Sequence, residues 1–267
     1  MKKNLKLLVV ANTVTLILML SANIAASIKA FTGQTVAEVS RKYDTLFAPA
    51  GYAFIIWGFL FLLSVCFVVF QWIELKENDP RKYIERTGIW FSLSNLANAA
   101  WLYFWLNEMI GSSVIVIFFL VLCLILLTVR LRLELDDEPV RAIFFVWWPI
   151  SFYLGWIMVA TAACISAWLV SLGWNGAGLQ KDTWTIIIIL ITCLLYLLLI
   201  RKRNMREAAI VGVWSFIAIA FRQWDSHHNI AITAIMAVLI LTVAISLHFF
   251  KNRFYAIGVK LKRGEWK

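Results

Sequence analysis

Charged residues are scarce in this sequence. Asp, Glu, Lys and Arg make up 15% of its 267 residues, whereas hydrophobic residues make up 62%, and the mean hydropathy is +0.82. Soluble domains carry about a quarter charged residues, so these values nearly exclude water-soluble enzymes and predict an integral membrane protein. The net charge of +10 does not indicate a nucleic-acid partner, because the basic residues form short clusters beside the apolar runs. Such clusters orient helices and attract anionic membrane lipid.

Residues suited to metal binding are also few. The four cysteines all fall inside apolar runs and form no C-x-x-C motif, which is typical of small buried hydrophobic residues. They are Cys66, Cys123, Cys164 and Cys193. The three histidines have no set of cysteines or carboxylates at ligand spacing. We therefore expect no metal site.

The long apolar runs lack acidic and basic residues in their middle parts. Ion pumps and proton-coupled carriers usually carry such residues within the membrane, so their absence argues against an ion-driven transporter. It also leaves no acid–base pair for catalysis there. The one polar cluster that could support an enzyme is His227 and His228 with Asp225 and Trp224. A solvated loop explains that cluster better, so the sequence favours a protein that is not an enzyme.

Eight apolar runs are candidates for membrane-spanning helices, because a span needs about 20 residues. They are Leu5–Ser27, Tyr52–Leu75, Ile89–Asn107, Val114–Leu131, Phe144–Leu172, Thr183–Ile200, Ala208–Phe221 and Ile230–Phe250. The seventh is short enough to be a half-span or an interfacial helix. The first could be a signal peptide, but its length and the amides of Asn12 and Asn23 favour a span.

The distribution of Lys and Arg predicts the orientation. With a cytoplasmic N-terminus and eight spans, only five of the 25 Lys and Arg residues lie outside: Lys29, Arg41, Lys42, Lys181 and Arg222. The positive-inside rule therefore predicts that both termini are cytoplasmic. The longest connection, residues 28–51, is then external. Val36, Val39 and Tyr43 recur in it at helical spacing, so we expect an amphipathic helix that is either a lid or an ordinary surface segment.

Tryptophan and asparagine occur at unusual depths in these runs. The stretch "NLANAAWLYFW" (95–105) places Asn95, Asn98 and Trp101 close to one helical face. Trp57 and Trp156, in the second and fifth runs, also lie deeper than an interfacial aromatic belt requires. Two interpretations remain open. The amides could join helices across their interfaces, or the indoles and amides could line a pocket for a flat apolar ligand.

Three blocks at these residues resemble the tryptophan-rich sensory protein, or translocator protein, family (TspO/MBR). "FAPAGYAFIIWGFLF" (47–61) is similar to its second-helix entry, "NLANAAWLYFW" to its third-helix N-x-x-W pattern, and "FYLGWIMVATAACISAW" (152–168) to its fifth-helix run. The sequence departs from the family pattern where Phe152 replaces a proline, Cys164 an asparagine, Ala48 the first of two prolines, and Ser94 a glutamine.

The resemblance implies a TspO-like five-helix bundle over residues 1–172. Three additional transmembrane helices (173–250) and a basic cytoplasmic tail (251–267) would follow. The resemblance also implies a membrane sensor or regulator that binds a porphyrin- or sterol-like molecule in an aromatic pocket in the outer half of the membrane. The alternative is a transporter or carrier of a lipophilic molecule. The predicted ligand-binding residues are Phe47, Tyr52, Trp57, Asn95, Asn98, Trp101, Trp105, Tyr153 and Trp156.

The expected partners follow from this assignment. They are a lipophilic small molecule and membrane lipid, with no resident cofactor and a tetrapyrrole as one candidate ligand. The sequence leaves the oligomeric state open, and a homodimer is compatible with it. Short loops and a lysine-rich start suit a bacterial inner membrane.

Overall fold

Eight long helices dominate the computed structural model, which describes residues 2–77, 81–252 and 257–266. They are α1 (Lys2–Ser27), α3 (Ile56–Glu74), α5 (Trp90–Leu106), α6 (Ile110–Arg130), α8 (Trp148–Ser171), α9 (Lys181–Arg203), α10 (Arg206–Gln223) and α11 (His228–Lys251). Each coincides, to within a few residues, with one of the eight apolar runs. The seventh run forms a helix of 18 residues, which is longer than the sequence pattern indicated.

Six helical segments in the described part of the chain are long and apolar enough to cross a membrane. They contain α1, α3, α6, α8, α9 and α11. The protein is therefore an all-α, multi-pass integral membrane protein. Because α5 and α10 are not among these six, eight crossings and the N-in/C-in orientation stay predictions.

Short helical segments occupy the two ends of the bundle. They are α2 (Val36–Lys42), the 3₁₀ turn η1 (Gly51–Ile55), α4 (Arg81–Thr87), α7 (Val140–Ala142), the π-helical turn η2 (Ile143–Trp147), the 3₁₀ turn η3 (Gly176–Gly178) and α12 (Ile257–Lys262). The expected amphipathic helix in residues 28–51 is confirmed as α2, and its Val39 is fully buried.

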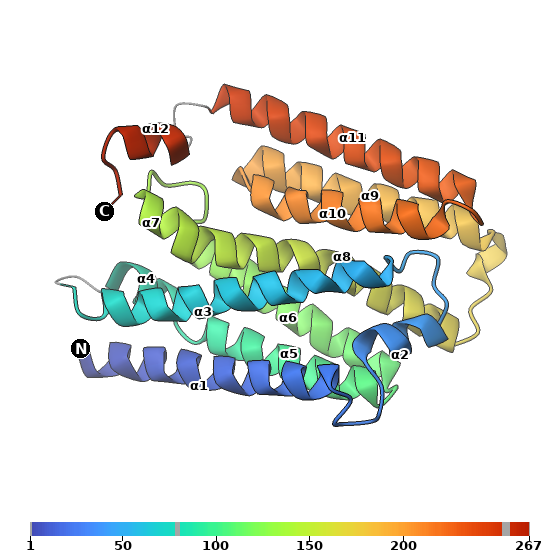
Figure 1. Ribbon diagram of the computed structural model, residues 1–267, viewed down its shortest axis with the longest axis horizontal. Helices are drawn as coiled ribbons and strands as arrows, with labels where there is room; N and C mark the ends of the chain where they lie inside the picture. The colour runs from blue at the N-terminus through green and yellow to red at the C-terminus, as the bar shows by residue number, and fades with distance from the viewer. Residues whose placement is uncertain (1, 78–80, 253–256, 267) are drawn as a thin grey trace.

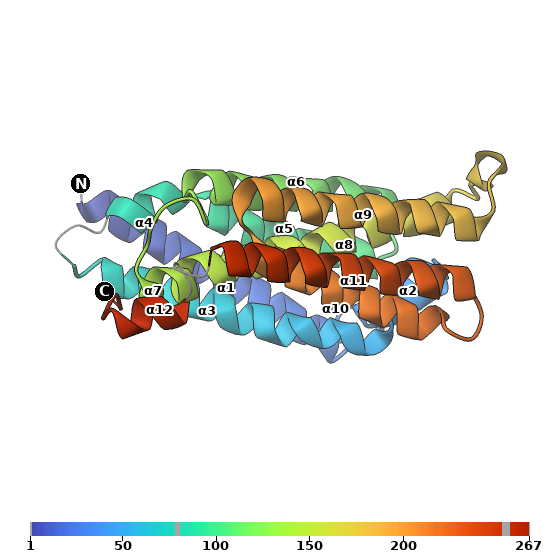
Figure 2. The same ribbon diagram turned by 90° about the horizontal axis from the view of Figure 1, so that it is seen from above.

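The long helices lie side by side in an elongated bundle (Figure 1). In that view α9, α10 and α11 form one side, α1, α3 and α5 the other, and α8 lies between them. Figure 2 shows both termini, α4, α7 and α12 at one end of the bundle, and α2 toward the other. We call these the terminal end and the α2 end.

Helix α8 joins the two sides through close backbone contacts. A Cβ atom at Gly155 would lie 2.7 Å from the backbone oxygen of Ala208 in α10, so α8 and α10 approach more closely there than any other residue would allow. The hydroxyl of Tyr196 in α9 donates a hydrogen bond to the Gly155 carbonyl at 2.7 Å. The last three helices are thus packed against the centre of the bundle.

Buried amides connect α1 to its neighbours. Asn12 donates to Gln71 of α3 at 2.9 Å and accepts from Ser92 of α5 at 2.6 Å. About three turns further along α1, Asn23 donates to the Asn98 side-chain oxygen at 2.9 Å. Such bonds replace water as the partner of each amide in an apolar environment, so α1 is an integral part of the bundle.

Candidate ligand-binding site

Four tryptophans from three helices meet beneath α2. Trp101 and Trp105 are one turn apart on α5, and their rings stack with centroids 5.6 Å apart. Trp57 of α3 meets Trp156 of α8 edge to face at 6.2 Å. The spacing of i and i+4 explains why the two α5 rings share a face. These four residues were all predicted for the site, and the structure brings them together.

The four indoles line a cavity of about 40 Å³. Phe54 and Pro49 extend the wall before α3, and Val159 and Ala163 complete it on α8. Val36 and Ser40 of α2 form the cover. Ligand pockets usually enclose about 300–1,000 Å³, so the cavity is too small for a ligand of ordinary size in this conformation.

Two of the indole N–H groups in the cavity wall are left without a partner. Trp101 Nε1 and Trp156 Nε1 are buried and have no hydrogen-bond acceptor among the described residues. Trp105 differs, because its Nε1 donates to the Val36 carbonyl of α2 at 3.2 Å. A buried donor without an acceptor costs about 1–3 kcal/mol. An acceptor on a bound molecule would relieve this cost at two positions.

Asn95, Asn98 and Tyr153 do not line this cavity. Asn95 donates to Thr15 of α1 at 3.3 Å, and Asn98 accepts from Asn23 as described above. Tyr153 packs edge to face against Trp57 at 6.1 Å, so it supports the cavity wall from behind. The Asn98 side-chain N–H₂ and the Tyr153 hydroxyl have no partners among the described residues.

Two further residues predicted for the site, Tyr52 and Phe47, do not line this cavity. Tyr52 packs edge to face against Trp214 and Phe221 of α10, with centroids 5.5 and 5.8 Å away. Phe47 is buried and lines a second cavity of about 80 Å³, which Trp174 and Trp184 also line. Both residues therefore fix the loop before α3 to the second half of the chain.

Polar contacts hold α2 over the cavity. Thr35 and Glu38 form a reciprocal capping box, and Lys29 bonds the Glu38 carboxylate at 2.7 Å. This contact and the Thr35 backbone N–H lower the pKa of Glu38 to about 2. At the other end of α2, Lys42 pairs with Glu108 at 2.5 Å and lowers the pKa of that carboxyl.

The sequence did not indicate which loop residues cover the cavity. Val36 and Ser40 lie on the amphipathic helix that the spacing predicted, but no pattern showed that this face would meet Trp105 rather than lipid or solvent. Asn12 and Asn23 were noticed as unusual for an apolar run. Their spacing could have suggested partners on the third run, where Ser92, Asn95 and Asn98 recur at intervals of three.

Comparison with known proteins identifies the family. A family model described as TSPO-like protein matches residues 9–247. This match extends past residue 172 and includes α9, α10 and most of α11. Searches among curated proteins and among solved structures gave no match. Because the family model covers most of the sequence, the chain belongs to the TSPO-like protein family.

Proposed function

We propose that this membrane protein is a sensor or regulator that binds a lipophilic, flat aromatic molecule, such as a porphyrin, between the four indoles under α2. Membership of the TSPO-like family supports a ligand-binding or sensory role in the membrane. The observation that carries the proposal is the pair of buried, unpartnered indole N–H groups of Trp101 and Trp156 in an aromatic cavity wall.

Binding requires α2 to move away, because a tetrapyrrole does not fit in about 40 Å³. The loop on one side of α2 is fixed: Arg222 of α10 donates to the carbonyls of Thr45 and Ala48 at 3.0 and 2.9 Å. The polar contacts of α2 itself are the exposed ion pairs at Glu38 and Glu108, which are weak, and the Trp105 bond, while Val39 is its fully buried apolar residue. Opening at α2 therefore breaks few strong polar interactions, and its main cost is the exposure of Val39.

The test is a titration of the purified full-length protein with protoporphyrin IX, followed by quenching of tryptophan fluorescence. Trp101→Phe and Trp156→Phe keep an aromatic ring and remove the N–H. Losing one hydrogen bond of about 1 kcal/mol should weaken binding about fivefold in each variant. Trp224→Phe, at an exposed position, is the matched control and should bind like the wild type.

Two results would refute this proposal. One is saturable quenching that is unchanged in the Trp101→Phe, Trp156→Phe double variant. The other is net flux of the same molecule across proteoliposomes that contain the protein, which would assign the cavity to the alternative function, a carrier for lipophilic molecules.

A further inference from the structure

A larger cavity lies at the terminal end, apart from the tryptophan site. Its volume is about 290 Å³, which is close to the lower limit for small-molecule pockets. The turn after α6, η2, the α9–α10 turn with the start of α10, the end of α11, and α12 all contribute to it. The lining residues used below are Glu134, Trp147, Asn204, Arg206, Glu207 and His248.

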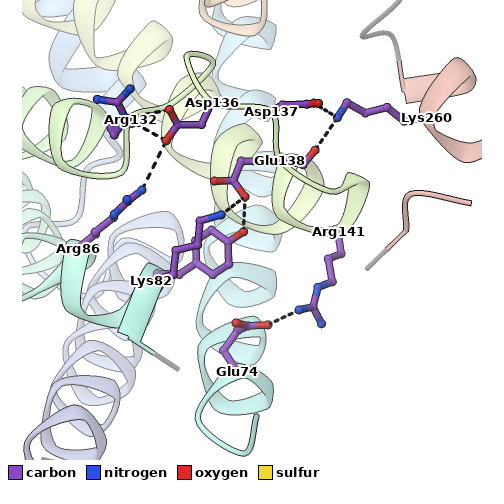
Figure 3. A network of polar contacts seen from close by, with 10 residues as sticks. Glu74, Lys82, Arg86, Arg132, Asp136, Asp137, Glu138, Arg141 and Lys260 are labelled. Carbon is purple, nitrogen blue, oxygen red and sulfur yellow. Dashed lines mark hydrogen bonds and ion pairs between the residues drawn. The ribbon is translucent and has the colours of Figure 1, made fainter. Parts of the chain in front are cut away.

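Two acidic residues at the edge of this cavity are already paired (Figure 3). Asp136 accepts two bonds from Arg132, at 2.8 and 2.9 Å, and lies 3.7 Å from Arg86. Asp137 pairs with the buried ammonium of Lys260, which also bonds the Glu138 carbonyl. These pairs hold the turn after α6 in place, and they leave no charge of Asp136 or Asp137 uncompensated.

Glu134 and Glu207 differ from these residues. Glu134 Oε1 and Glu207 Oε2 are buried and have no hydrogen-bond partner among the described residues, and only 9% of the Glu207 surface is exposed. Burial and the nearby Glu207 carboxylate raise the pKa of Glu134 well above its usual value. The positive charge of Arg206 favours the ionised form of both carboxyls. Its guanidinium lies over the Phe249 ring at 5.7 Å, and its Nε has no hydrogen-bond partner among the described residues.

The rest of the wall fixes the geometry of this acidic pair. The Asn204 side chain donates to the Glu134 carbonyl at 2.9 Å, and its oxygen bonds His248 Nε2 at 2.9 Å. These contacts hold the Glu134 backbone against α11. Trp147 provides an aromatic face and is itself buried. The cavity therefore combines unpaired acceptors with an aromatic wall.

We infer that this cavity binds a small organic cation with a primary ammonium group. The ammonium would donate hydrogen bonds to Glu134 and Glu207, and its alkyl part would pack on Trp147. Charge-assisted bonds of this kind are stronger than neutral ones, and an aromatic face attracts a cation. A metal ion fits less well, because the described residues contain no group of three His, Cys, Asp or Glu side chains placed to hold one.

The experiment measures thermal unfolding of the full-length protein in detergent with increasing butylammonium chloride at constant ionic strength. We expect a saturable rise in Tm of a few degrees, and no such rise with butanol, the neutral analogue. Glu134→Gln and Glu207→Gln keep the side-chain shape but cannot ionise to pair with the ammonium, so each should weaken binding at least tenfold. Glu85→Gln, at an exposed position of the same end, is the matched control.

A further variant tests the inference even if the glutamine variants do not fold. Arg206→Gln removes a competing positive charge, so butylammonium should bind more tightly to it than to the wild type. The inference is wrong if butylammonium gives no saturable shift, if butanol gives the same shift, or if Arg206→Gln weakens binding. A Tm that depends on pH but not on the amine would indicate that Glu134 and Glu207 share a proton instead of binding an ammonium group. That result would also overturn the inference.

Discussion

At the scale of single residues, buried amides decide how α1 packs. The sequence predicted that Asn95 and Asn98 face the interior, and it left open whether they join helices or orient a ligand. The structure pairs both with α1. Spacing along one helix shows which residues share a face, but it does not show which neighbouring helix that face meets. The sequence therefore showed polar positions on both runs, and the structure was needed to show that Asn95 meets Thr15 and Asn98 meets Asn23.

Replacing Asn12 should weaken the bundle measurably. Asn12→Leu removes the bonds to Gln71 and Ser92 and leaves both of these buried groups without that partner. Interhelical hydrogen bonds in membranes contribute about 0.6 kcal/mol on average, with a maximum near 1.7, so we expect a loss of about 1–2 kcal/mol. Unfolding in a mixed detergent titrated with SDS measures it. Leu7→Ala, at an exposed position of the same helix, should change little; equal losses in both variants would contradict the assignment.

Replacing glycine by alanine should have opposite effects on stability at positions 155 and 58. Gly155→Ala would place a methyl group 2.7 Å from the backbone of Ala208, which cannot move without separating α8 from α10. We expect a loss of about 1–3 kcal/mol. The methyl group added by Gly58→Ala in α3 would have no atom within 4 Å, and the change removes a poor helix former. It should therefore stabilise the protein by about 0.5–1 kcal/mol. The same SDS titration compares them, and a Gly155→Ala variant as stable as Gly58→Ala would disprove the close α8–α10 contact.

At the scale of elements, the helices of the bundle were easier to predict than the segments that close its ends. A run of about 20 apolar residues has few alternatives to a helix in a membrane, and each of the eight runs forms one. The segments α4, α7 and α12 were not predicted, because they have only three to seven residues and no long apolar pattern. Contacts with the turn after α6 and with the chain end define them instead.

The α2 helix should loosen in acid. The folded-state pKa of Glu38 is depressed from 4.5 to about 2. The stabilisation of α2 by the Glu38 carboxylate is therefore fully present above pH 4.5 and is lost as the pH falls toward 2. The pKa of Glu108 is shifted in the same direction. Hydrogen exchange of the α2 amides, corrected for the intrinsic rate at each pH, should be faster at pH 3 than at pH 6.

Glu38→Gln provides the control for this prediction. The variant lacks the carboxylate that Lys29 and Thr35 stabilise, so its α2 amides should already exchange faster at pH 6 and depend less on pH. Exchange of the wild-type α2 amides that stays constant between pH 6 and pH 3 would show that these ion pairs do not hold the helix over the cavity.

At the scale of the whole molecule, both halves of the chain build the end that contains the tryptophan cavity. The motifs predicted a five-helix unit in residues 1–172, with three helices added to it. Here α10 bonds the loop that leads to α3: Gln223 donates to Leu46 at 2.8 Å, and Trp214 donates to Ala53 at 3.2 Å. These contacts join residues more than 150 positions apart, and no local pattern could reveal them.

A chain cut after residue 172 should therefore lose the tryptophan site rather than keep it as an independent domain. Without α9 and α10, the Gly155 carbonyl loses its bond from Tyr196, and the loop carbonyls of Thr45 and Ala48 lose Arg222. Residues 1–172 alone should bind protoporphyrin IX at least tenfold more weakly than the full chain, as measured by tryptophan quenching. Co-expression with residues 173–267 should restore binding, because the separated halves retain every one of these contacts. Full affinity in the truncated chain would instead show that the first five long helices position the four indoles without help from α10.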